Sequence, residues 1–134
     1  MAARRFVPPL ATAALLAAGC GGDPPAPPSP PAKLTHEERQ LVRVYEGRIE
    51  THCIRVARSV VDPRKAPTPR QEERAFAAAD AFAALATRKP KAPIDVGQDL
   101  RLYLSDVVEN LEGSNCDPRM VARLERALDA IPNE

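Results

Sequence analysis

A recurring pattern of helix start and stop signals constrains the fold of this chain more than any other feature of its sequence. Proline has no backbone N–H and its ring clashes with the preceding helical turn, so it stands in the first turn of a helix or beyond its end. The prolines that fit such boundary positions are Pro63, Pro69, Pro90, Pro118 and Pro132. With the capping residues, they predict helices near residues 36–61, 69–88, 96–112 and 118–131.

Capping residues mark where these helices begin. The first two start with capping boxes, Thr35-His36-Glu37-Glu38 and Thr68-Pro69-Arg70-Gln71, in which a threonine and the residue three positions later satisfy each other's backbone N–H groups. Asp95 and Asp117 are predicted as the N-caps of the third and fourth helices. Gly113 is predicted to end the third helix, because it tolerates the left-handed conformation.

Apolar residues recur at spacings of three and four in each of the four segments, which gives each helix one apolar face. The second segment is rich in alanine, whose small side chain permits a close approach to a neighbouring helix. No run of alternating apolar and polar residues predicts a strand. Because the connections are short, neighbours should be antiparallel, and we expect an all-α domain built as a small four-helix up-and-down bundle.

The N-terminal segment has the order of a secretion signal. Arg4 and Arg5 precede the uncharged residues 6–18, a stretch shorter than the roughly 20 apolar residues that span a bilayer. It ends in Leu15-Leu16-Ala17-Ala18-Gly19-Cys20, which resembles the lipobox of bacterial lipoproteins. The resemblance implies that residues 1–19 are a cleaved signal peptide. It also implies that the Cys20 thiol receives a diacylglycerol and its amino group a further acyl chain such as palmitate. The alternatives are an ordinary cleaved signal peptide and a chance apolar N-terminus.

Residues 20–33 are predicted to link this lipidated cysteine to the helical domain, residues 34–134. The stretch 23–31 reads DPPAPPSPP, with six prolines in nine residues. Such a run favours the extended polyproline conformation at about 3.1 Å per residue. From Cys20 to Leu34 this gives a semi-rigid, disordered tether of roughly 40 Å. A proline-rich ligand for another domain is the alternative.

With Cys20 assigned to lipid, Cys53 and Cys116 remain. Export favours oxidation and an even number favours one bridge, so we expect a structural Cys53–Cys116 disulfide. The neighbouring His52-Cys53 suggests a metal or nucleophile site as a rival, but adjacent helical residues point about 100° apart. A redox or haem role would need a Cys-x-x-Cys pattern, which the sequence lacks.

The sequence offers no constellation for catalysis, and we expect no catalytic residues, metal or cofactor. His36 and His52 lie sixteen residues apart, about 24 Å along one helix at about 1.5 Å per residue, too far to share a metal. The pairs 37–38 and 72–73 are glutamates in first helical turns, where negative charge complements the helix dipole. The formal charge of +1 gives no pull toward nucleic acid.

We therefore expect an envelope lipoprotein held at the cell membrane or outer membrane, with its domain facing the extracytoplasmic side. Its expected role is non-catalytic, as an interaction or structural module with an unidentified protein partner. The rival is a small-molecule-binding bundle with a cavity lined by Phe76, Phe82 and Tyr103. A cavity would favour the rival, whereas a filled core with an exposed apolar patch would favour a partner protein.

Overall fold

The computed structural model describes residues 32–132. The predicted signal peptide, Cys20 and the linker up to residue 31 lie outside the described residues. The elements, in chain order, are α2 (His36–Val61), η1 (Pro63–Lys65), α3 (Pro69–Arg88), β1 (Pro93–Asp95), β2 (Gln98–Asp99), α4 (Leu100–Gly113) and α5 (Pro118–Asp129).

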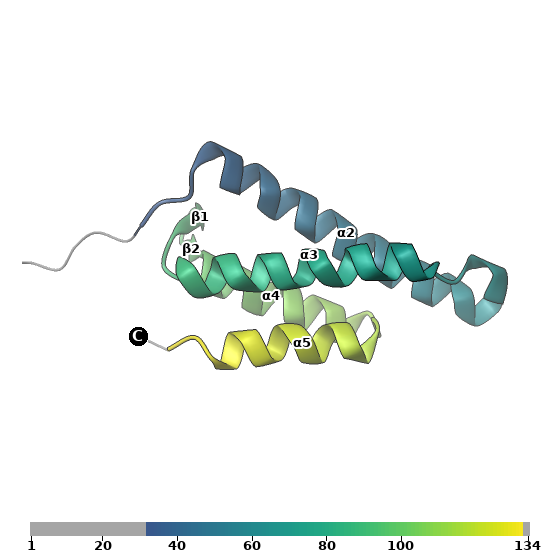
Figure 1. Ribbon diagram of the computed structural model, residues 1–134. Helices are drawn as coiled ribbons and strands as arrows, with labels where there is room; N and C mark the ends of the chain where they lie inside the picture. Colours follow the sequence, from purple (N-terminus) through teal and green to yellow (C-terminus); the bar gives the residue numbers. More distant parts are fainter. Residues whose placement is uncertain (1–31, 133–134) are drawn as a thin grey trace, which may run out of the picture. The chain divides into compact units, whose positions relative to one another are not determined.

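The four helices run alternately in opposite directions and form the expected all-α, up-and-down bundle (Figure 1). Helix α3 contacts each of the other three helices, and α4 also contacts α5. Within residues 32–132, no helix combines the length and the apolar character needed to cross a bilayer.

The predicted start signals of α2 and α3 are confirmed. The Glu38 amide donates to the Thr35 hydroxyl at 3.0 Å, and the Thr35 amide donates to the Glu38 carboxylate at 2.9 Å. Thr68 and Gln71 make the same reciprocal pair at the start of α3. Two otherwise unpaired backbone donors are satisfied at each helix start, which explains why both begin where the sequence indicated.

The predicted start of the third helix, and the expectation of no strand, are wrong. Residues 93–99 form a short antiparallel ribbon of β1 and β2, and the chain reverses at Gly97, whose φ is +74°. Asp99, and not Asp95, caps α4 by accepting from the Leu102 amide at 2.9 Å. The left-handed residue after α4 is Asn115 (φ +56°), while Gly113 belongs to the helix.

The core draws on all four helices. Its largest fully buried side chains are Val42, Ile49, His52, Phe82, Leu100, Leu104, Met120 and Leu124. Helix α3 contributes mainly alanines to this core, so its backbone approaches its neighbours closely, as expected from its composition. A single histidine among these apolar residues is the feature that the fold alone does not explain.

Candidate functional site

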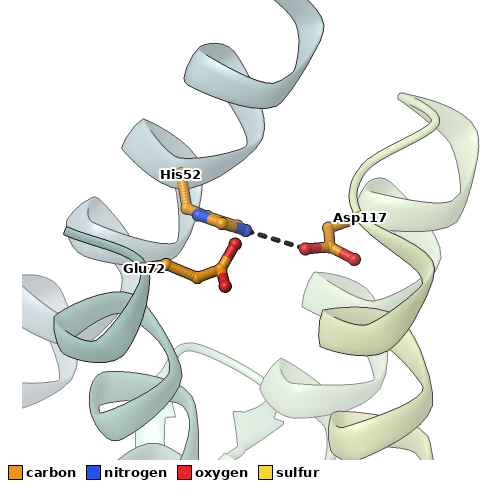
Figure 2. A group of neighbouring side chains, drawn as sticks. All are labelled: His52, Glu72 and Asp117. Atoms are coloured by element: carbon orange, nitrogen blue, oxygen red, sulfur yellow. Dashed lines mark hydrogen bonds and ion pairs between the residues drawn. The ribbon is translucent and has the colours of Figure 1, made fainter. Parts of the chain in front are cut away.

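The buried histidine belongs to a cluster of charged side chains from three elements. Figure 2 shows His52 of α2, Glu72 of α3 and Asp117, the residue before α5, pointing toward one another. One potential ligand atom from each residue lies within 4.8 Å of the others. His52 Nε2 donates to the Asp117 carboxylate at 3.0 Å, since an ionised carboxylate only accepts.

Asp117 is the centre of this cluster and its oxygens are fully engaged. The carboxylate accepts four hydrogen bonds, from His52 Nε2 and from the backbone N–H, Nε and Nη2 of Arg119. Burial raises the pKa of the Asp117 carboxyl, but the bonds from Arg119 and His52 outweigh burial and lower the pKa to about 2. The group is therefore a carboxylate at neutral pH.

Arg119 also neutralises the second carboxylate of the cluster. Its Nη2 lies 2.8 Å from Glu72 Oε2, and this hydrogen bond lowers the pKa of Glu72. The hydrogen bonds to Asp117 and Glu72 raise the pKa of Arg119 in turn. A metal ion at this point would have to displace the guanidinium from both acids, so the geometry favours a structural ion cluster over a metal centre.

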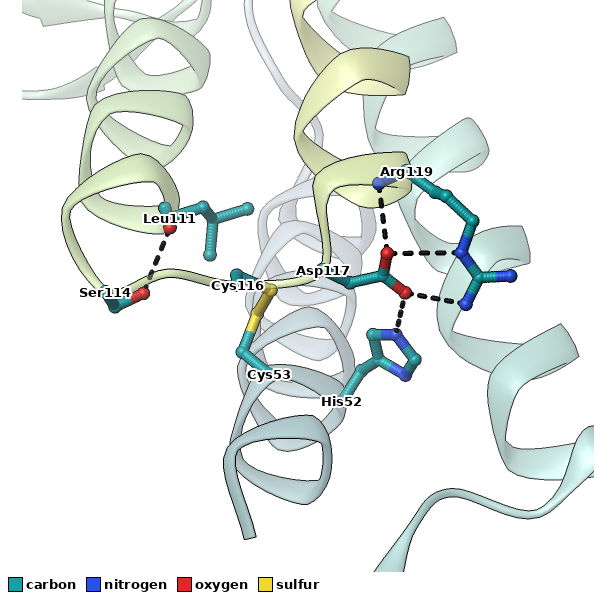
Figure 3. The surroundings of a disulfide bond; sticks show 7 residues. All are labelled: His52, Cys53, Leu111, Ser114, Cys116, Asp117 and Arg119. Atoms are coloured by element: carbon teal, nitrogen blue, oxygen red, sulfur yellow. Dashed lines mark hydrogen bonds and ion pairs between the residues drawn. A yellow bond between two sulfur atoms is a disulfide. The ribbon is translucent and has the colours of Figure 1, made fainter. Parts of the chain in front are cut away.

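The structure joins Cys53 to Cys116 through a disulfide, in agreement with the predicted pairing. Figure 3 shows that this bond lies next to the His52–Asp117 pair. Two consecutive residues of α2 thus hold two consecutive residues before α5, one through a covalent bond and one through a hydrogen bond. The start of α5 is fixed to the middle of α2 twice.

Sequence reasoning missed the cluster, although a signal for it was present. His52 and Asp117 are 65 residues apart, so no local spacing connects them. Each is, however, the direct neighbour of a cysteine in the predicted disulfide. Once Cys53 and Cys116 are paired, their polar neighbours become candidates for contact. His36, by comparison, lies within 3.2 Å of Gln40 on the first turns of α2.

The three aromatic residues expected around a ligand cavity do not lie together: Phe82 is next to Tyr103, whereas Phe76 is next to His52. Phe82 is fully buried and lies 5.9 Å from Tyr103, centroid to centroid. The Tyr103 hydroxyl donates to Glu46, and burial together with this bond raises the pKa of Tyr103. Phe76 instead lies edge-on to His52 at 5.4 Å, with the guanidinium of Arg123 4.7 Å above its ring.

An apolar surface begins beside the disulfide. A groove of about 490 Å³ lies between α2 and α4, where Cys53, Ile54 and Ala57 face Leu111, with polar residues at its rim. Helix α4 ends at Gly113, and α2 continues to Val61 (Figure 1). The last turns of α2 carry three exposed apolar side chains, Ile54 (49% exposed), Val60 (83%) and Val61 (89%).

We call residues 53, 54, 57, 60 and 61 the α2 stripe. Their spacings of one, three and four place them along one side of the helix, as in a helix–helix contact. Comparison of the chain with family models, curated proteins and solved structures found no match.

Proposed function

We propose that this chain is a membrane-anchored envelope lipoprotein whose helical domain, a non-catalytic module, binds a partner protein. The observation that carries the proposal is the α2 stripe, an apolar helix face that begins in a groove and continues past the end of α4. The occupant that fits it is an amphipathic helix of another protein, lying where a longer α4 would lie. Its apolar face would cover Ile54, Val60 and Val61.

The Cys53–Cys116 disulfide supports the location of the module. Disulfides of this kind persist in exported proteins and are rare in reducing compartments. The disulfide therefore agrees with the secretion signal inferred for residues 1–19 and with a lipid on Cys20. Two or more acyl chains give stable anchoring, whereas one gives only reversible attachment.

The rival small-molecule role depends on a cavity between Phe76, Phe82 and Tyr103. Phe82 is instead buried beside Tyr103, and Phe76 lies with the ion cluster. A buried apolar core with an exposed apolar stripe is the combination expected of a partner-binding domain.

Photocrosslinking in intact cells tests the partner site. A photoreactive amino acid replaces Val61 in one form of the full chain and Val96 in the other, because both valines are highly exposed and Val96 lies in the β-ribbon. We expect one discrete adduct with a second protein from position 61, and its loss when Ile54→Asp is added. Equal adducts from both positions, no adduct, or an adduct of two copies of this chain would overturn the proposal.

Membrane attachment is tested separately. The intact mass of the mature chain should show a diacylated or triacylated Cys20 as its first residue, and Cys20→Ser should release the domain from membranes. A mature chain that begins elsewhere without lipid would contradict the lipoprotein assignment and leave the partner test unaffected.

A further inference from the structure

A second groove, on the α2–α3 side of the domain, is lined by arginines. It has a volume of about 430 Å³, and Arg43, Arg48 and Arg55 of α2 face Arg74 of α3 across it. No acidic side chain lines this groove. The arrangement concentrates positive charge in a concave surface, which strengthens the attraction for an anion.

The groove arginines differ from several others in the domain. Arg64, Arg88, Arg119 and Arg123 each lie within 4.0 Å of a carboxylate. Within residues 32–132, none of the four groove arginines has such an ion pair. In the described part of the chain, no carboxylate therefore competes with a ligand for these guanidinium groups.

One further polar side chain of the groove, Gln71, also suits an anion. Its side-chain oxygen accepts from the Thr68 amide at 2.9 Å, which leaves the NH₂ group to donate to a ligand. The Thr51 hydroxyl already donates to the Gly47 carbonyl at 2.8 Å, so its proton does not serve a ligand. At Gly47 an added Cβ would meet no atom within 4 Å, so this glycine leaves the α2 side of the groove open.

The geometry points to a binding site for a polyanion that carries at least two phosphate groups. Arginine binds phosphate through two parallel N–H···O bonds, a geometry that its planar guanidinium matches. Arg43 and Arg55 are twelve residues apart on one helix, about 18 Å at about 1.5 Å per residue, so the arginines extend along the groove and offer donors to more than one phosphate. This site is distinct from the α2 stripe and goes beyond the proposed partner binding.

Binding is measured with the full chain in detergent, using inorganic tripolyphosphate as the soluble probe. The second arm is free of detergent and uses the Cys20→Ser chain, which lacks the proposed acyl anchor. It compares vesicles that contain about one fifth anionic phospholipid with neutral vesicles. The groove variant is Arg48→Gln with Arg74→Gln. The matched control, Lys91→Gln with Arg126→Gln, removes the same charge from exposed residues of the 89–93 turn and of α5. We expect at least tenfold weaker binding in the groove variant and a change below twofold in the control.

A third variant separates a shaped site from general charge attraction. Gly47→Leu keeps every arginine and fills the open side of the groove, so it should also weaken binding at least fivefold. Groove-dependent binding to tripolyphosphate supports a soluble ligand, and groove-dependent binding to anionic vesicles alone supports a lipid headgroup. No binding in either arm, or equal loss in the groove and control variants, would overturn the site. A circular dichroism melt of each variant verifies that it is folded.

Discussion

Replacing Asp117 by asparagine should destabilise the domain by about 2 kcal/mol at pH 7. The pKa of this carboxyl is about 2, against an ordinary value of 3.8, and one pKa unit corresponds to about 1.4 kcal/mol. Asparagine keeps an oxygen that can accept from the Arg119 amide at the start of α5. The substitution removes the negative charge that holds the Arg119 guanidinium and the His52 ring. The decrease in the free energy of unfolding therefore measures the contribution of the ion cluster.

The same reasoning fixes the direction of the pH dependence. The pKa of the Asp117 carboxyl is lower in the folded state than in the unfolded state. As the pH falls, the unfolded chain therefore binds a proton at this carboxyl before the folded chain does. The stabilisation is complete well above pH 3.8 and is lost as the pH falls from about 4 to about 2. The difference between the parent and Asp117→Asn should therefore shrink toward zero over this interval.

Urea unfolding of the full chain in detergent, followed by circular dichroism at pH 7, 5, 3 and 2, measures this difference. The control is Glu109→Gln, which removes a negative charge from an exposed position of α4 and should change stability by less than about 0.5 kcal/mol. An Asp117→Asn variant as stable as the parent at pH 7 would refute the reasoning. So would a difference that stays constant between pH 4 and 2.

Three further variants probe the fold by the same unfolding measurement. Cys53→Ala with Cys116→Ala opens a link that spans 63 residues and should cost about 4 kcal/mol; a reducing agent that has no effect on the parent would contradict this. Gly47→Ala should add up to about 1 kcal/mol, since alanine favours the helix interior and has free space here, and a loss would show hidden crowding. Phe82→Ala should cost about 3–5 kcal/mol, and a cost below 1 would mean that its site collapses.

The sequence predicted the helix starts well where a local signal decides them. Thr35 and Thr68 each cap a helix through contacts within three residues, and proline fixes the first turns of α3 and α5. Asp95 was the only cap predicted for the third helix, and this prediction was wrong. The structure uses Asp99 because Gly97 turns the chain into a ribbon whose strands have three and two residues, too short for a periodic pattern.

The disulfide, the ion cluster and the arginine groove also differ in how far the sequence alone could predict them. The disulfide followed from the number of cysteines and the expected compartment. The ion cluster needs Glu72, His52 and Asp117 from distant parts of the chain, and the arginine groove needs Arg74 opposite α2. No residue spacing in the sequence predicts either arrangement. Contacts in the core decide how each helix is rotated about its axis, and this rotation decides which side chains face each other.

The Cys53–Cys116 bond also determines how the domain responds to mechanical force. If the chain is pulled from its N-terminal side and from its C-terminus, the force bypasses the segment between the two cysteines, whose sequence separation is 63. Only the part of α2 before Cys53 and the segment from Cys116 onward can then extend. That is fewer than about 40 residues, or roughly 130 Å at about 3.5 Å per residue. Under tension, α3 and α4 would stay connected as a shielded loop, and reduction of the disulfide would more than double the length that the domain can release.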